Sequence, residues 1–461
     1  KHLFMEFAAL GHEPQILHTH LKMEGTWSMH RAGTRWKKPA HAARVVLSLD
    51  DAPRDPIELV GFWLGLVRVF PAREYEAEMG YLGPDLLDPD FDADEAVRDL
   101  QAIDRLNTDG MPGKGEAVAV RAFRTGEDSS LQFRFKLYRR GPTVPLSDVM
   151  PILADMGLKT LEEYGYPIRP AGDAEIHVHE FLMEDPRGEA LVFDEIRRPF
   201  EQAFAAAWSG LTESDGFNRL VVELGVTWRE AALIRTLARY RQQTGLDPSQ
   251  AVQEEALREY PDVSRALVSL FKAKFEGEAT VQAREPLVAE LDDKITGLLQ
   301  DVQSLDHDRA LRRLARLINA VKRTNYFQTD AEGQPKSYIA IKIASRELDD
   351  LPLPKPYREI FVWAPHVEGV HLRFGPVARG GLRWSDRRDD FRTEVLGLVK
   401  AQMVKNTVIV PVGSKGGFYA KQLPDATLDR DAWFAEGVAC YKRFINGLLD
   451  ITDNVDKVTG D

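Results

Sequence analysis

The sequence predicts a multidomain chain that combines α+β and α/β regions. Short, alternating apolar segments separated by turn signals fill the first hundred residues. Apolar residues recur at helical spacing between about 199 and 327. Strand-like segments return after 338 and enclose one helix that lies between two glycine pairs. At 461 residues the chain has room for roughly three domains of ordinary size.

Composition narrows the class of protein. Hydrophobic residues make up 44% and charged residues 29%, which is typical of a water-soluble globular chain. No apolar run approaches the roughly 18 residues of a membrane span, so we expect no membrane partner. The net charge of −12 argues against a surface that is generally suited to nucleic acids. The single cysteine, Cys440, excludes an intrachain disulfide and a four-cysteine zinc site, which fits a cytoplasmic protein.

Residues 1–100 are predicted to form a β-rich unit. Its strands are expected in "LHTHLKM", "ARVVLSL" and "LVGFWLGLVRVF", with Pro- and Asp-rich turns between them. His18 and His20 alternate on one strand face and could suggest metal ligands. A zinc site needs three or four ligands, so the pair is interpreted as surface or core, and no metal is predicted.

Residues 101–195 are predicted to form a small α+β module. "VAVRAFR" and "LQFRFKLYRR" alternate, with Leu131, Phe133, Phe135 and Leu137 on one face. "LSDVMPILADMG" has the pattern of a helix, and "AEIHVHEFLM" that of a further strand. The histidines of that last strand receive the same interpretation as His18 and His20.

Residues 196–330 are predicted to be helical. Thr227 and Glu230 have the spacing of a capping box, and Gly245 is placed to end the helix that follows. A later stripe is most simply the apolar face of a core helix. Its members are Leu311, Leu314, Ile318 and Val321.

Residues 331–461 contain the candidate site. "GPVARGGLRWSD" and "VIVPVGSKGGF" each hold a glycine pair, and the helical pattern "FRTEVLGLVKAQMVKN" lies between them. The second motif is not a phosphate-binding P-loop, because no Ser or Thr follows its lysine. A strand, a helix and a second strand would bring Arg379, Lys405 and Lys415 to one cleft. The pairs Gly380 with Gly381 and Gly416 with Gly417 would wall this cleft without side chains.

Three converging cations call for an anion, and a small dicarboxylate would satisfy them. Crowding and burial also lower the pKa of a lysine, which would let Lys415 exchange protons near neutral pH. An alternative is that Lys405 simply occupies a helix C-terminus, where positive charge is favoured by ~0.3–1 kcal/mol.

The motifs "GPVARGGLRWSDR", "DFRTEVLGLVKAQMVKN" and "VIVPVGSKGGF" resemble the large bacterial NAD-specific glutamate dehydrogenases, and the resemblance extends back to about residue 100. It implies oxidative deamination of L-glutamate to 2-oxoglutarate and ammonia, and a homo-oligomer at full length. Lys415 would be the catalytic lysine that activates water and stabilises the carbinolamine. Lys405 would contact a substrate carboxylate, and Arg379 occupies the position of a lysine in the smaller hexameric enzymes. Residues 118–183 resemble an ACT-type module.

The same resemblance implies that parts of the active site are missing from this chain. The family's catalytic aspartate and its NAD-binding Rossmann domain follow the glycine-lysine motif at a distance that the chain does not reach. No G-x-G-x-x-G follows a predicted strand. We therefore expect NAD to be the cofactor of the family, its binding domain to lie outside this chain, and the chain alone to lack turnover.

The first hundred residues resemble the N-terminal β-sandwich of the formamidopyrimidine-DNA glycosylase and endonuclease VIII family. By this resemblance Lys1 would approach the DNA backbone, and Met23 would fill the gap left by a flipped base. The family's N-terminal proline nucleophile and adjacent glutamate would lie before Lys1, so base excision is not expected. Two alternatives to a dehydrogenase fragment stay open: a DNA-binding fragment and an amino-acid-binding regulatory module. A natural fusion and two joined gene fragments both fit this combination of segments.

Overall fold

A computed structural model describes the chain in part. In the first 92 residues it describes only the backbone of six strands. From 93 to 452 it describes the chain except at 110, 114, 127, 169–174, 189, 248, 278, 377 and 406–411. The chain divides into two compact units: Lys1–Arg121 with Phe135–Pro145 and Glu162–Phe181, and Ala122–Arg134 with Leu146–Leu161 and Leu182–Asp461. Among the described residues, no helix is long and apolar enough to cross a membrane.

The N-terminal strands form two small antiparallel sheets. One has the order β1-β2-β6 and the other the order β3-β5-β4. This agrees with a β-rich segment of short strands. Lys1 and Met23 lie outside the described residues, so their proposed DNA contacts stay predictions. The strands are β1 (His2–Phe7), β2 (Gln15–His20), β3 (Thr26–Arg31), β4 (Val45–Leu49), β5 (Ile57–Phe62) and β6 (Val67–Pro71).

A five-stranded sheet of order β10-β11-β9-β8-β7 follows, together with helix α2 (Ala93–Asp109). The predicted boundary at residue 100 falls inside α2, where Ile103 is fully buried in an apolar cluster with residues of β8, β9 and β11. α2 therefore packs with the module that follows it in sequence. The strands are β7 (Met111–Gly113), β8 (Gly115–Phe123), β9 (Gln132–Arg140), β10 (Lys159–Ile168) and β11 (Ile176–Glu184).

Strand β9 is buried on both faces, which its alternating pattern did not reveal. Phe133, Phe135 and Leu137 are buried as expected, but so are the intervening Lys136 and Tyr138. Asp99 of α2 accepts hydrogen bonds from Lys136 Nζ at 2.7 Å and from the Tyr138 hydroxyl at 2.6 Å. The polar residues of this strand belong to a buried ion-pair network, because α2 covers the face that would otherwise meet water.

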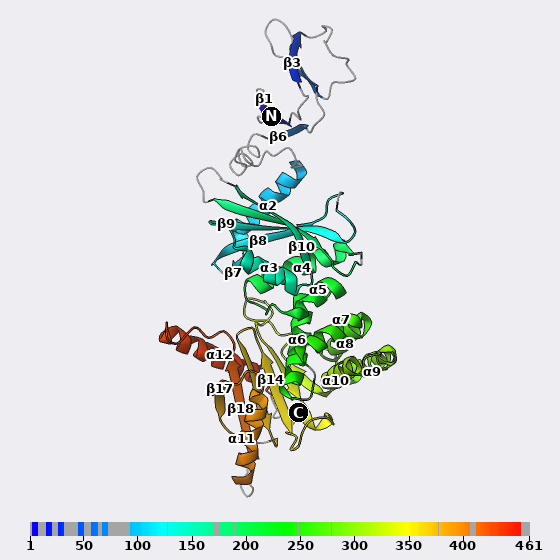
Figure 1. The fold of residues 1–461 in the computed structure, drawn as a ribbon, viewed down its shortest axis with the longest axis vertical. Coiled ribbons are helices and arrows are strands. Elements are labelled where there is room, and N and C mark those ends of the chain that lie inside the picture. Colours follow the sequence, from blue (N-terminus) through cyan, green and yellow to red (C-terminus); the bar gives the residue numbers. More distant parts are fainter. Residues whose placement is uncertain are drawn as a thin grey trace. The chain divides into compact units, whose positions relative to one another are not determined.

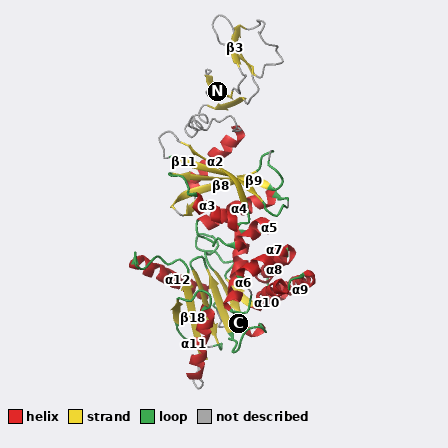
Figure 2. Ribbon diagram, viewed as in Figure 1, coloured by secondary structure: helices red, strands yellow, loops and turns green. Residues whose placement is uncertain are grey.

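Helices dominate the middle of the chain (Figure 2). The capping box of α6 is confirmed: Glu230 N donates to Thr227 Oγ1 at 3.2 Å, and Thr227 N donates to Glu230 Oε2 at 2.8 Å. Gly245 follows the last turn of this helix with a φ of 71°, a left-handed conformation that ends helices. The helices are α3 (Leu146–Asp155), α4 (Phe193–Trp208), α5 (Arg219–Leu224), α6 (Trp228–Gln243), α7 (Gln250–Glu259), α8 (Pro261–Phe275), α9 (Val281–Leu298) and α10 (Leu305–Ala320).

A seven-stranded sheet carries the candidate site (Figure 1). Its order is β12-β13-β14-β15-β18-β16, and β17 also pairs with β18. The strands are β12 (Val321–Thr324), β13 (Ile339–Ile343), β14 (Arg358–Trp363), β15 (Val367–Arg373), β16 (Ala378–Arg379), β17 (Leu382–Ser385) and β18 (Val412–Ala420).

Helices cover both faces of this sheet. Phe361 and Leu372 belong to an apolar cluster with α6, α8, α10 and α11 (Phe391–Lys405). Val362 and Phe418 belong to a second cluster with Cys440 and other residues of α12 (Arg430–Asp450). Successive residues of a strand point to opposite faces, so the strands of this sheet are apolar on both sides. The result is a three-layer α/β/α arrangement.

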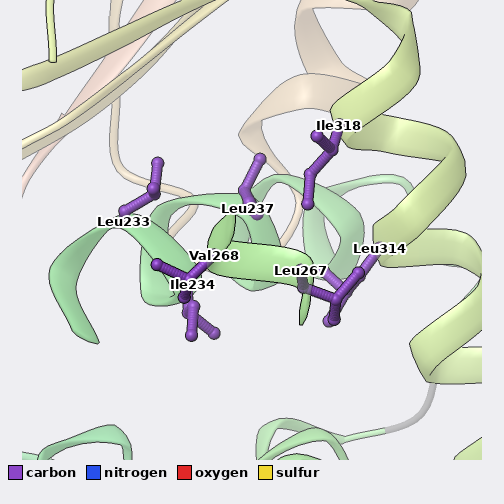
Figure 3. Close-up of a pocket in the computed structure, with 7 residues that line it drawn as sticks. All are labelled: Leu233, Ile234, Leu237, Leu267, Val268, Leu314 and Ile318. Carbon is purple, nitrogen blue, oxygen red and sulfur yellow. The ribbon is translucent and has the colours of Figure 1, made fainter. Parts of the chain in front are cut away.

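A small cavity lies among α6, α8 and α10 (Figure 3). It contains no converging polar groups, so we interpret it as a packing gap and not as a ligand site. Leu314 and Ile318, two of the apolar residues predicted for the core helix, line this cavity. Val321, the last residue of that predicted set, is instead the first residue of β12. The lining residues are Leu233, Ile234, Leu237, Leu267, Val268, Leu314 and Ile318.

Candidate functional site

Lys415 lies inside strand β18 and is half-buried. It pairs with Leu372 of β15 on one side, while β17 runs parallel to β18 on the other. At the glycine pair that follows Lys415, both neighbouring strands supply backbone hydrogen-bond partners. Gly416 N, for example, donates to Gly381 O at 3.2 Å.

The strand-helix-strand arrangement is confirmed as β17, α11 and β18, with the two strands parallel. Arg379 stands opposite Gly413, and Leu382 opposite Gly416. Since side chains alternate along a strand, Arg379, Gly381 and Lys415 belong to one face of the sheet. α11 covers this face, because a Cβ on Gly417 would lie 2.6 Å from Val395 of that helix.

The glycines have two different roles. A Cβ on Gly380 would lie 1.5 Å from the carbonyl oxygen of Ser414, and one on Gly416 would lie 2.4 Å from Leu382. Those two glycines and Gly417 therefore permit close packing and do not wall an open cleft. A Cβ on Gly381, in contrast, would meet only Lys415 Nζ, at 3.9 Å. Gly381 is the one of the four that leaves space beside the lysine.

The Lys415 ammonium group has no acidic partner among the residues that the structure describes. The first turn of α11 carries a carboxylate, Glu394, that is already engaged. It binds Arg383 Nε at 2.5 Å and accepts a hydrogen bond from Ser385 Oγ at 2.6 Å. A half-buried cation without a counter-ion is suited to binding an anionic ligand.

Arg379 and Lys405 are placed only in part. Arg379 is exposed, and its carbonyl accepts a hydrogen bond of 3.3 Å from Gln402 Nε2 of α11. α11 ends at Lys405, whose side chain is outside the described part of the structure. The expected separation of about 10 Å or less between the two lysine ammonium groups therefore stays a prediction.

Gln402 was missed by the sequence reading. Its Oε1 is buried without a hydrogen-bond partner among the described residues and would lie 3.0 Å from a Cβ on Gly413. The available signal was its position three residues before Lys405, which puts the two on one helix face.

The first turn of α11 is fixed by buried polar contacts that the sequence did not reveal. Arg392 donates to Glu359 of β14 at 2.8 Å and 2.7 Å, and both side chains are almost fully buried. The Tyr240 hydroxyl donates to Glu359 Oε2 at 3.0 Å. Gln243 accepts from Arg392 N at 3.3 Å and donates to Arg388 O at 2.8 Å.

Burial opposes the charge of Arg392, but Glu359 and Tyr240 outweigh it and raise the pKa of the guanidinium group. Burial, and then Glu359, raise the pKa of the Tyr240 hydroxyl. Tyr240 therefore remains protonated and acts as a hydrogen-bond donor. These groups form a closed set of charge-assisted hydrogen bonds.

His371 is a second group that the sequence reading passed over. It stands opposite Gly416 in the β15–β18 ladder, and its Nδ1 is buried with no hydrogen-bond partner in the described part of the chain. Burial, assisted by Arg373, lowers the pKa of this imidazole to about 4. His371 is on the sheet face opposite that of Lys415, since successive residues of β18 alternate.

We expect protonation of His371 to destabilise the fold in acid. The pKa is about 6.5 in an unfolded chain and about 4 in the fold. Stability is therefore unaffected above about pH 6.5 and falls as the pH drops toward 4, by on the order of 3 kcal/mol at most. Urea unfolding at pH 7.5 and 5 should show a smaller acid loss for His371→Gln. Equal losses in both proteins would show that this histidine does not contribute.

The described residues include no group of three or more His, Cys, Asp or Glu that could hold a metal ion. His179 accepts a backbone hydrogen bond from Val144 N at 3.2 Å, and its Nδ1 lies 2.7 Å from Glu163. His177 Nδ1 lies 2.7 Å from the carbonyl oxygen of Gly141. Both histidines are structural.

The described residues around the site do not fit a dinucleotide. A dinucleotide pyrophosphate needs a glycine-rich turn between a strand and a helix N-terminus. The turn between β17 and α11 is "DRRDD", residues 386–390, with no glycine. The described turn at this site therefore offers no glycine-rich cradle for a pyrophosphate.

Comparisons with known proteins identify three consecutive segments. Residues 117–196 match the model "Glutamate dehydrogenase, ACT3 domain", and residues 212–277 match "Glutamate dehydrogenase, helical motif 3". Residues 294–459 match "Bacterial NAD-glutamate dehydrogenase, catalytic domain". This last segment begins before the predicted boundary at 331 and includes β12, the edge strand of the seven-stranded sheet.

Individual relatives give the same result. The chain is 44% identical over 366 residues to the NAD-specific glutamate dehydrogenase of Halomonas elongata, with 79% of this chain and 22% of that protein covered. For the Pseudomonas aeruginosa enzyme the identity is 47% over 326 residues, with 70% and 20% covered. The chain thus spans about a fifth of these relatives.

A further segment is similar to a different protein. The probable endonuclease 8 2 of Streptomyces coelicolor is 36% identical over 103 residues, which are 22% of this chain and 33% of that protein. Three segments of the chain thus match models of the ACT3, helical motif 3 and catalytic domains of glutamate dehydrogenases, the last of them bacterial and NAD-dependent, and a further segment is similar to endonuclease 8.

Proposed function

We propose that the chain forms the substrate-binding part of an NAD-dependent glutamate dehydrogenase, which converts L-glutamate to 2-oxoglutarate and ammonia. The observation that carries this proposal is the Lys415 ammonium group. It is half-buried beside the open side of Gly381, without an acidic partner among the described residues. A dicarboxylate supplies the missing negative charge.

We propose the following roles for the residues of this site. Lys415 is the catalytic residue, and its ammonium group donates to the carbonyl oxygen of 2-oxoglutarate or holds the attacking water. Arg379 and Lys405 bind carboxylates, and Gly381 leaves room for the ligand. Gly380, Gly416 and Gly417 bring β16, β17, β18 and α11 close enough to form the site. NAD is the cofactor of the relatives by their names. We propose that it binds outside the residues described here, and that the full-length protein is a homo-oligomer.

Calorimetric titration tests the proposal. We expect the 461-residue chain to bind 2-oxoglutarate and glutarate, which carry two carboxylates, more tightly than the monocarboxylate butyrate. We also expect no NADH formation from glutamate and NAD, because the chain has no dinucleotide-binding fingerprint. Equal affinity for all three ligands, or no binding of 2-oxoglutarate, would contradict the proposed site. Glutamate binding that persists in Lys415→Ala would indicate a regulatory amino-acid site in the ACT segment instead.

A second candidate function is weak DNA binding by residues 1–100. The similarity to an endonuclease 8 over 103 residues favours it. Fluorescence anisotropy with a labelled duplex should then show binding that weakens steeply with salt, because phosphate contacts release counterions. Lys1→Ala should reduce the signal and Lys415→Ala should not. No anisotropy change at low salt would exclude this function.

A further inference from the structure

We infer that Tyr240 and Gln243 of α6 are positioning residues for helix α11, so that the helical motif controls the affinity of the lysine site in the catalytic domain. The inference rests on the proposed function and extends it to a region that no ligand is expected to touch. α6 belongs to the helical motif 3 segment, whereas β14 and α11 belong to the catalytic segment.

The contacts at the first turn of α11 bind three elements together. Tyr240 donates to the carboxylate of Glu359, and the same carboxylate receives both donors of Arg392. The Arg392 guanidinium group also lies over the Tyr240 ring, 5.9 Å from its centroid. The Tyr240 hydroxyl therefore helps to hold the acid that fixes the first turn of α11.

Gln243 makes the second link, to the backbone. Its side chain accepts a hydrogen bond from Arg392 N and donates one to Arg388 O. Both partners belong to the segment where the chain leaves β17 and enters α11. The side-chain oxygen of Gln243 thus accepts from a backbone N–H that a helix start otherwise leaves free. Its position therefore determines where α11 begins.

The rest of α11 connects its first turn to the lysine site. Phe391, Val395 and Val399 are fully buried in the core, and Val395 packs against Gly417 of β18. Gln402, about three turns after Phe391, donates a hydrogen bond to the carbonyl oxygen of Arg379. A helix of this length is stiff and about 20 Å long, so a tilt at its first turn displaces its last. Lys405 is the last residue of this helix.

Small displacements matter at such a site. A misplacement of roughly 1 Å costs up to about 100-fold in a reaction that depends on aligned groups. We therefore expect loss of either α6 contact to weaken dicarboxylate binding by about tenfold, although neither residue touches the ligand.

The test uses the whole chain with Tyr240→Phe and Gln243→Leu, which keep the size of each side chain. Tyr260→Phe is the matched control. Its hydroxyl accepts a hydrogen bond of 3.1 Å from Gln303 N in the helical region and, among the described residues, makes no hydrogen bond with α11. Two readouts are needed: the dissociation constant of 2-oxoglutarate, and amide hydrogen exchange across residues 391–405.

We expect both α6 variants to speed exchange in α11 and to raise the dissociation constant about tenfold, while Tyr260→Phe changes neither. A purely structural role would lower the melting temperature of all three variants alike and leave affinity unchanged. Exchange in α11 that stays at the wild-type rate in both variants would overturn the inference, whether or not ligand binds. Absence of 2-oxoglutarate binding by the unaltered chain would instead count against the proposed function.

Discussion

Replacement of Glu359 by alanine is expected to lower the free energy of unfolding by about 3–5 kcal/mol, because it leaves the buried Arg392 without a counter-ion. Glu359 is completely buried, and the exposed fraction of the Arg392 side chain is 1%. The Tyr240 hydroxyl would lose its acceptor in the same variant. Urea unfolding at neutral pH measures the loss.

Two comparisons separate this pair from an ordinary surface pair. Lys322 and Glu347 lie 2.8 Å apart with side chains 41% and 52% exposed, so Glu347→Ala should cost less than about 1 kcal/mol. The double variant Glu359→Leu with Arg392→Met removes both charges and should regain much of the loss, because no charge is left unpaired. A loss for Glu359→Ala no greater than that for Glu347→Ala would show that Arg392 reaches water or another acid.

Lys415→Ala is expected to weaken 2-oxoglutarate binding by about 10- to 100-fold. A hydrogen bond between charged groups contributes about 1.5–3 kcal/mol, and each 1.4 kcal/mol is a factor of about ten. The free energy of unfolding should change little, because among the described residues no acidic side chain would lose an ion-pair partner when Lys415 is replaced. Titration calorimetry measures the affinity.

Lys442→Ala is the matched control, since it removes the same charge from an exposed position of α12, on the other face of the sheet. It should bind 2-oxoglutarate as the unaltered chain does. Equal weakening by both substitutions would mean that the ligand responds to net charge and not to this site.

The local parts of the fold were predictable from sequence. The capping box of α6 is written in neighbouring residues, Thr227 and Glu230, and the positive φ of Gly245 follows from its being a glycine at a helix end. The β17–α11–β18 arrangement was visible because the glycine motifs flank a helical pattern. The position of Lys415 inside strand β18 could not be predicted from the sequence. Two adjacent glycines usually indicate a turn, and only the pairing with β15 and β17 explains why the strand continues.

The buried polar groups could not be found from sequence because their partners are distant in the chain. Arg392 and Glu359 are separated by 33 residues, and Tyr240 and Glu359 by 119. Each of these residues reads locally as a surface charge or a core aromatic. Lys136 likewise looked like the exposed side of an alternating strand until α2 placed Asp99 against it. Sequence reasoning therefore proposed the cations of the candidate site, but it could not predict the contacts that hold helix α11.

The most direct measurement is the protection of individual lysines by ligand. Amine-selective acetylation followed by mass spectrometry reports the reaction rate of each lysine with and without saturating 2-oxoglutarate. If Lys415 meets the dicarboxylate, its acetylation should slow markedly in the presence of ligand while Lys442 reacts at an unchanged rate. Acetylation of Lys415 at the same rate with and without saturating 2-oxoglutarate would contradict the proposed site.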